Sequence, residues 1–158
     1  MSPRAAWRLE ALGFEQVYDY MPGKADWLAH GLGREGDQAD APHAGDFVDR
    51  DPPTCAPDVT VEEAREILAE SRYGFCLVLN DRRVVVGRVR RSAVEGVDAS
   101  APVESVVEPG PSTVRANVSA GALVERLADR GLRTAIVTTP GGVLIGVFSR
   151  AEAERRLE

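Results

Sequence analysis

The sequence contains few of the residues that build metal sites and disulfide frameworks. Among its 158 residues there are two cysteines and two histidines. Cys55 and Cys76 have no CxxC spacing, and no pair of histidines lies near them. This pattern excludes a zinc site and a disulfide framework. A redox pair of the two cysteines stays open, although nothing in their spacing supports it, and Cys76 is expected to be a small, inert core residue.

Long apolar runs and an excess of positive charge are also missing. No run approaches the ~18 apolar residues needed to span a bilayer, and no signal-peptide core follows Met1. The 19 Lys and Arg against 25 Asp and Glu give a formal net charge of −6, which argues against nucleic acid or an anionic membrane as a partner. We therefore expect a cytoplasmic protein. A hydrophobic content of 44% is sufficient for one ordinary domain or two small ones.

Residues 34–52 are poor in apolar side chains. Acidic residues alternate there with Gly, Ala and Pro. Such a composition predicts a solvated acidic linker, with residues 38–44 as its most mobile part. The linker separates residues 1–33 from the rest of the chain.

The remainder contains two copies of one unit. Thr54 and the six residues after it correspond to Thr113 and the six after it, an offset of 59 positions. The same offset, without a gap, places residues 76–78 on 135–137 and residues 84–87 on 143–146. We assign residues 53–98 to the first copy, and residues 99–158, with the segment that leads into it, to the second.

Each copy is predicted to run strand, helix, strand, strand, helix. Thr60 and Ser119 are the expected N-caps of the first helix in each copy. A final helix is expected to begin near Arg91 and near Arg150. The apolar strands between them need cover on both faces. The predicted fold is therefore α+β, with two β-α-β-β-α repeats packed about a pseudo-twofold axis. The apolar strands are expected at residues 75–79 and 84–88 in the first copy and 134–138 and 143–148 in the second.

Two such units in tandem resemble a pair of CBS domains, also called a Bateman module. The likeness covers roughly residues 53–158, and residues 103–111 resemble the short helix and proline-rich stretch that precede a second CBS unit. In that family the pair offers two clefts, which often bind adenosine-containing ligands. The resemblance implies a regulatory module that binds AMP, ADP, ATP or S-adenosylmethionine, and it implies a homodimer.

The family's nucleotide motif is a glycine, two apolar residues, Thr or Ser, two variable positions and Asp. In the second repeat it places Ser149 at the hydroxyl position and Glu152 where Asp is usual. A hydroxyl at a helix N-terminus can approach a phosphate, and a carboxylate can accept both ribose hydroxyls. The same spacing suits a capping box, with Ser149 as N-cap and Glu152 at N3, so both roles stay open. The other candidates for this cleft are Thr113, Arg115 and Thr134.

The first repeat departs further from the motif. Arg90 stands at the hydroxyl position and Ala93 at the carboxylate position, so there is no acceptor for a ribose. Arg88, Arg90 and Arg91 could instead receive the phosphates of a nucleotide held mainly by the second repeat, because guanidinium groups match phosphate oxygens. The alternative is a solvated basic face.

Residues 2–32 resemble the C-terminal end of a rhodanese domain. The pattern predicts a small helix-strand-helix fragment, with Trp7 and Trp27 as packing anchors. We expect this fragment to fold on the CBS pair, because its apolar residues would otherwise form an exposed patch. Its predicted elements are a helix over residues 5–13, a strand over 14–20 and a helix over 24–30.

The rhodanese likeness implies no activity for this chain. In that family the nucleophilic cysteine lies in a loop just before the matched helix, upstream of Met1, and neither cysteine of this chain occupies that place. No other catalytic arrangement is found. We therefore expect a non-catalytic module that senses an adenosine-type ligand. The alternatives are a ligand-free dimerisation or partner-interaction module, and a fragment of a longer sulfurtransferase-type protein that joins rhodanese and CBS domains.

Overall fold

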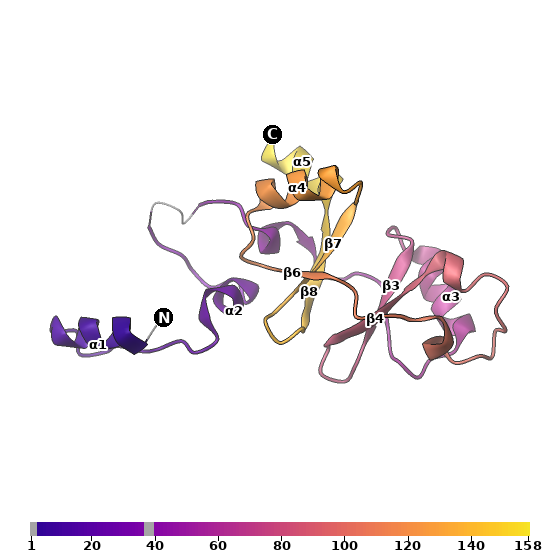
Figure 1. The fold of residues 1–158 in the computed structure, drawn as a ribbon, viewed down its shortest axis with the longest axis horizontal. Helices are drawn as coiled ribbons and strands as arrows, with labels where there is room; N and C mark the ends of the chain where they lie inside the picture. The colour runs from indigo at the N-terminus through magenta and orange to yellow at the C-terminus, as the bar shows by residue number, and fades with distance from the viewer. Residues whose placement is uncertain (1–2, 37–39) are drawn as a thin grey trace.

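The computed structural model describes residues 3–36 and 40–158. Figure 1 shows that the described chain forms two sheets side by side, with an extended N-terminal arm. The helices are α1 (Pro3–Ala11), α2 (Gly23–Ala29), α3 (Val61–Glu70), α4 (Ala120–Asp129) and α5 (Arg150–Leu157), with 3-10 helices η1 (Ala44–Phe47), η2 (Arg91–Ala93) and η3 (Val103–Val106). The strands are β1 (Val48–Asp49), β2 (Thr54–Cys55), β3 (Phe75–Leu79), β4 (Val85–Arg90), β5 (Glu108–Pro109), β6 (Thr113–Arg115), β7 (Thr134–Thr138) and β8 (Leu144–Ser149).

The two repeats build equivalent sheets, as the sequence predicts. The first contributes β2, β3 and β4, and the second β6, β7 and β8, in each case a parallel pair followed by an antiparallel pair. Thr60 and Ser119 are the N-caps of α3 and α4, because their hydroxyls accept the backbone N–H of Glu63 and Ala122. The α+β fold with two related repeats is thus confirmed.

One edge strand of each sheet comes from the segment that leads into the other repeat. β1 pairs with β8, so the sheet orders are β1-β8-β7-β6 and β2-β3-β4-β5. We call residues 43–49 and 102–109 the leading segments. Each also contributes an apolar side chain to the repeat that it joins: Phe47 lies in the core of the second repeat and Val103 in that of the first.

The exchange of strands shows that part of the predicted linker is folded. Residues 44–49 lie within the expected solvated segment of 34–52, yet Ala44 and Phe47 are buried and β1 is part of a sheet. The prediction missed them because a 3-10 turn and a two-residue strand carry too few apolar positions to show a period. Part of the stretch expected to be mobile, residues 38–39, lies outside the described residues.

Two glycines allow the exchanged strands to approach. A Cβ atom on Gly146 would collide with the backbone carbonyl of Asp49 in β1, and a Cβ atom on Gly87 would collide with a side-chain methyl group of Val107. Both glycines lie in the middle of the strand that accepts the edge strand. Gly146 therefore allows close packing of backbone on backbone, whereas Gly87 makes room for the side chain of Val107.

A pseudo-twofold axis passes between the two sheets. Val84 and Val143, which are equivalent under the offset of 59, form an antiparallel bridge with each other. The hydrogen bonds beside them are also exchanged: the N–H of Val85 donates to Gly142 and the N–H of Leu144 donates to Arg83. A shared apolar core joins the repeats here, and it consists of Phe75, Leu77, Leu79, Ile136, Leu144 and Val147.

The N-terminal arm differs from the prediction. Its two helices form close to the expected positions, but residues 14–20 form no strand. Trp7 is 67% exposed, so it is not the packing anchor that the sequence predicts, whereas Leu28 and Ala29 of α2 reach the core of the second repeat. The alternating pattern of residues 14–20 was misleading because no neighbouring strand is available to satisfy its backbone groups.

The final helix of the first repeat is also shorter than predicted. Arg91 begins only the 3-10 turn η2, and Gly96, at a φ of 74°, lies shortly beyond it. A positive φ at glycine ends helical structure. In the second repeat the corresponding helix, α5, does form. Across residues 3–36 and 40–158, none of the helices has both the length and the apolar character to cross a bilayer.

Candidate functional site

A cleft of about 400 Å³ opens where the second repeat meets the leading segment of the first. We call it the Ser149 cleft. Its floor is the β8–α5 junction, one wall is η1 and β1, and the loop between α3 and β3 reaches it from the first repeat. The lining residues are Phe47, Val48, Asp49, Arg72, Tyr73, Arg133, Thr134, Val147, Ser149, Arg150, Ala151, Glu152 and Arg156.

Three of the predicted site residues meet in this cleft. Thr134, at the start of β7, lies directly opposite Ser149, at the end of β8. Glu152 follows in the first turn of α5. The strand register therefore brings together residues that are 15 or more positions apart in the sequence.

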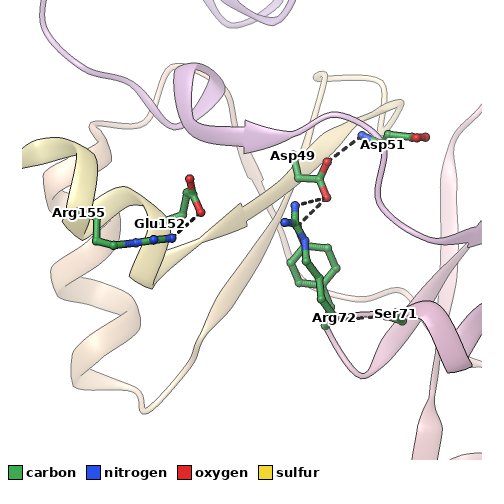
Figure 2. A network of polar contacts seen from close by, with 7 residues as sticks. Asp49, Asp51, Ser71, Arg72, Glu152 and Arg155 are labelled. Carbon is green, nitrogen blue, oxygen red and sulfur yellow. Dashed lines mark hydrogen bonds and ion pairs between the residues drawn. The ribbon is translucent and has the colours of Figure 1, made fainter.

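The capping box that the sequence allows is not formed. Ser149 is the N-cap of α5, but its side chain makes no capping hydrogen bond. The Glu152 carboxylate instead accepts a hydrogen bond from Arg155 at 2.8 Å (Figure 2). The Ser149 hydroxyl and the N-terminal N–H groups of α5 thus border the cleft without the reciprocal bonds of a capping box.

A polar network joins β1 to the first repeat across this cleft. Figure 2 shows Arg72 pointing at Asp49, whose Oδ2 accepts hydrogen bonds from Arg72 and from the Tyr73 hydroxyl, both at 2.7 Å. Burial raises the pKa of Asp49, but the bonds from Tyr73 and Arg72 outweigh it and hold this pKa below its ordinary value. Burial and the bond to Asp49 raise the pKa of Tyr73 to about 12. Asp49 is therefore ionised and Tyr73 protonated near neutral pH.

The cleft is rich in arginine although the whole chain is acidic. Four arginines face two carboxylates, Asp49 and Glu152, among its lining residues. Arg72 is paired with Asp49, and the Arg150 guanidinium lies 3.5 Å from Glu154. The four arginines are Arg72, Arg133, Arg150 and Arg156. A cleft with this charge suits an anionic ligand.

Thr113 and Arg115 do not reach the cleft. β6 pairs with β7 so that Thr113 lies opposite Ile136 and Arg115 opposite Thr138, toward the other end of β7 from Thr134. The Arg115 guanidinium donates to the Thr138 hydroxyl at 2.5 Å. Both residues are thus placed at the opposite edge of the sheet, and their assignment to this cleft is wrong.

Arg90 lies at the equivalent place in the first repeat, which we call the Arg90 face. Glu108 of β5 accepts a hydrogen bond from Arg88 at 2.7 Å and one from Arg90 at 2.6 Å. The bond from Arg88, supported by Arg90, lowers the pKa of Glu108. Arg91 donates to the carbonyls of Leu68 and Ser71 at the end of α3. These three arginines thus contact groups of the chain itself, and none of them lines the Ser149 cleft.

The sequence reasoning missed Asp49, Arg72, Tyr73, Arg133 and Arg156. One signal could have found Asp49. When the alignment of the two repeats is extended toward the N-terminus, the offset of 59 pairs Val48 and Asp49 with Val107 and Glu108. The remaining residues lie on loops and on a helix end, where no pattern marks them. Arg72 and Tyr73 reach the cleft through their bonds to Asp49 of the exchanged strand, which only the tertiary structure reveals.

The two cysteines are neighbours in the core of the first repeat. Their sulfur atoms lie 3.8 Å apart, with Cys76 fully buried and Cys55 nearly so. The contact with Cys55 and the burial of the thiol raise the pKa of Cys76. A protonated, buried thiol is a poor nucleophile, which agrees with the expectation of an inert core residue.

Comparison with known proteins agrees with this geometry. Residues 44–95 match the model of the CBS domain. The structure is similar to that of the CBS-pair protein CBSX2 from Arabidopsis thaliana, with a TM-score of 0.63 at 21% identity over 74% of this chain and 94% of that one. The fold is that of a CBS domain pair. CBSX2 has also been solved in complex with AMP, and that structure matches with a TM-score of 0.64 at 22% identity, over 73% of this chain and 96% of that one.

Further matches cover only part of longer chains. The cytosolic domain of the Mg²⁺ channel MgtE in complex with ATP matches with a TM-score of 0.63 at 16% identity, over 74% of this chain and 49% of that one. Proteins named GMP reductase from Mycobacterium bovis and Mycobacterium tuberculosis are 30% identical over 110 residues, which is 70% of this chain. The chain spans 23% of the length of these curated relatives.

Proposed function

We propose that this chain is a non-catalytic regulatory CBS-pair module that binds an adenosine nucleotide in the Ser149 cleft. CBS-pair proteins are generally regulatory, and two solved structures with this fold hold AMP and ATP. In the proposed binding mode the Ser149 hydroxyl and the N-terminus of α5 approach phosphate, and Glu152 accepts the ribose hydroxyls.

The state of Ser149 carries this proposal. A serine at an N-cap ordinarily bonds to the backbone two or three residues ahead, as Ser119 does in α4. Ser149 makes no such bond, and it borders a cleft of about 400 Å³. That volume falls within the range of pockets that bury a small organic ligand.

Calorimetric titration of the purified chain with AMP, ADP and ATP tests the proposal. We expect at least one nucleotide to bind, and we expect the S149A and E152Q variants each to weaken it about tenfold, because each loses one polar contact to a partly solvated ligand. The matched control is Glu125→Gln, an exposed α4 residue outside the cleft. Unchanged affinity in S149A and E152Q would remove the site, and no binding of any of these nucleotides would remove the function.

The N-terminal arm favours a second function, that of a partner-interaction module. Among the described residues, seven of the ten large apolar side chains that remain exposed lie between Trp7 and Leu32. Such a concentration is typical of an interaction surface. Light scattering of the full chain and of a variant with Trp7→Ser and Phe14→Ser tests it: a homodimer that the variant loses supports this function, and a monomer in both cases contradicts self-association.

The cytoplasmic location and the rhodanese likeness stay predictions. The likeness of MgtE, whose matched part is described as a cytosolic domain, supports a cytoplasmic location. The rhodanese likeness of residues 2–32 now depends on its sequence pattern alone, because residues 14–20 form no strand. Fractionation of cells that produce the chain tests the location, and recovery of the chain in the membrane pellet would contradict it.

A further inference from the structure

The arginines of the Ser149 cleft differ in what they contact. Arg72 is held by Asp49 and Arg150 lies near Glu154, so each has a carboxylate partner within the protein. Among the described residues, Arg133 and Arg156 have none. Arg156 donates to the backbone carbonyl of Asp46 at 3.2 Å and lies over the ring of Phe47. With these neutral partners the Arg156 guanidinium forms no ion pair among the described residues.

Arg133 is the less constrained of the two. Its backbone carbonyl accepts the N–H of Arg150, which fixes the chain at the start of β7 beside the N-terminus of α5. Its side chain is exposed and makes no hydrogen bond or ion pair among the described residues. Thr134, the next residue, lies opposite Ser149, so Arg133 is adjacent to the place where the first phosphate is expected.

The equivalent positions in the first repeat offer no guanidinium group that lacks a carboxylate partner. Under the offset of 59, Arg133 corresponds to Gly74, while Arg90 and Arg88 there are bound to Glu108. The smaller hollow of about 270 Å³ beside α3 also contains arginines, but Arg65 and Arg91 donate to backbone carbonyls. Of the arginines that line these two hollows, Arg133 alone makes no side-chain hydrogen bond or ion pair among the described residues.

We infer that the Ser149 cleft selects nucleotides with two or three phosphates over a monophosphate, and that Arg133 and Arg156 determine this preference. The inference rests on the proposed function and names the ligand class of that same site. The N-terminus of α5 with Ser149 receives one phosphate, and a guanidinium without a carboxylate partner stabilises each further phosphate through charge-assisted hydrogen bonds. ADP and ATP carry this additional charge and AMP does not.

Calorimetric titration with AMP, ADP and ATP at one fixed ionic strength measures the preference directly. We expect the wild-type chain to bind ATP about tenfold or more tightly than AMP. In the R133Q variant the ratio of the AMP and ATP dissociation constants falls toward one, because the variant loses a contact to the outer phosphates. The matched control is Arg130→Gln, which removes the same charge three residues earlier, at an exposed position outside the cleft.

A second measurement tests the phosphate contacts without the nucleoside. Inorganic tripolyphosphate is expected to displace ATP from the wild-type chain and to displace it less well from R133Q. R156Q is expected to behave in the same way, with circular dichroism used to check that η1 remains packed, since Arg156 also contacts Phe47.

The outcomes separate the inference from the proposed function. AMP bound as tightly as ATP by the wild-type chain overturns the phosphate preference and leaves the nucleotide site in place. A preference that R133Q and R156Q leave unchanged overturns the assignment of these arginines. No binding of any of the three nucleotides overturns the proposed function and the inference together.

Discussion

The Ser149 cleft and the Arg90 face occupy equivalent places on the same backbone, yet their chemistry is opposite. In the second repeat the strand ends in Ser149 and the helix carries Glu152; in the first, the same positions hold Arg90 and Ala93. Glu108 fills the Arg90 face by binding two arginines of the adjacent strand. The comparison teaches that a few side chains decide whether a cleft of this fold stays open to a ligand or is closed by the protein's own ion pairs.

Asp49 and Glu108, which occupy equivalent positions under the offset of 59, also differ in what they connect. Glu108 is held by β4 of its own sheet, whereas Asp49 lies in the sheet of the second repeat and is held by Arg72 and Tyr73 of the first. The positions equivalent to Arg72 and Tyr73 are Gly131 and Leu132, which cannot make these bonds. A ligand that approaches Asp49 therefore contacts both repeats, and one at Glu108 would contact one sheet.

The largest expected effect comes from the two glycines that accept the exchanged strands. Gly146→Ala should lower the free energy of unfolding by about 3 kcal/mol, because the added Cβ meets the backbone of Asp49. Gly87→Ala should cost about 1 kcal/mol, because the side chain of Val107 can move. Urea denaturation of both variants measures the difference. Equal losses would contradict the expected difference between a contact with backbone and a contact with a side chain.

An exchange of side chains between the repeats sharpens the comparison of the clefts. Ser149→Arg gives the second repeat the residue of the first, and it should weaken nucleotide binding at least tenfold, about 1.4 kcal/mol, because the arginine occupies the phosphate position. The reciprocal variant, Arg90→Ser, should gain no binding, since Ala93 offers no ribose acceptor. Calorimetric titration checks both, and a nucleotide bound by the Arg90→Ser variant at a second site would contradict the prediction.

A smaller contrast is expected between the helix caps. Thr60 forms a complete capping box with Glu63, whereas Ser119 makes one bond, at 3.4 Å, to the N–H of Ala122. Thr60→Ala should therefore cost about 1 kcal/mol and Ser119→Ala about half as much. Chemical denaturation of the two variants in parallel measures these values. A larger loss for Ser119→Ala would show that the box around Glu63 contributes little.

The smallest effect concerns pH. The pKa of Glu108 is lowered by its bonds to Arg88 and Arg90, so its contribution to stability is present above the ordinary carboxylate pKa and is lost as the pH falls through the lowered value. The pKa of Asp49 is also lowered, so its contribution to stability depends on pH in the same way, and its side chain is less exposed than that of Glu108. Exposed pairs contribute about 0 to 1 kcal/mol.

Denaturation between pH 6 and 3, in a variant series of Asp49→Asn and Glu108→Gln, checks this sign. The loss of stability on acidification should be shallower in both variants than in the wild-type chain, and shallower in Asp49→Asn than in Glu108→Gln. Curves parallel to the wild type would show that neither ion pair is formed in solution.

The sequence predicted the parts of the fold that repeat with a strong apolar pattern. The strands around Leu77 and Ile136 and the caps at Thr60 and Ser119 follow from that pattern, because buried strands and capped helices leave a local signature. The strand expected around Val17 failed because alternation alone cannot supply a neighbouring strand.

The site could be predicted only where it follows the motif. Ser149 and Glu152 come from local spacing, and Thr134 joins them through the register of β7 and β8. Arg115 was misplaced because its position depends on the parallel pairing of β6, which fixes the end of the sheet at which it lies. Asp49 was missed because it reaches the cleft through a two-residue strand borrowed from the segment before the first repeat.

The exchanged edge strands have a consequence for folding. The repeat that is visible in the sequence is not the unit that folds, because β8 is completed by Val48 and Asp49, close to a hundred positions earlier in the chain, and β4 by Glu108 and Pro109 from the segment before the second repeat. Long-range pairing of this kind links the melting of the two halves. A break in the chain between them would deprive each half of an edge, so their stability is held in common.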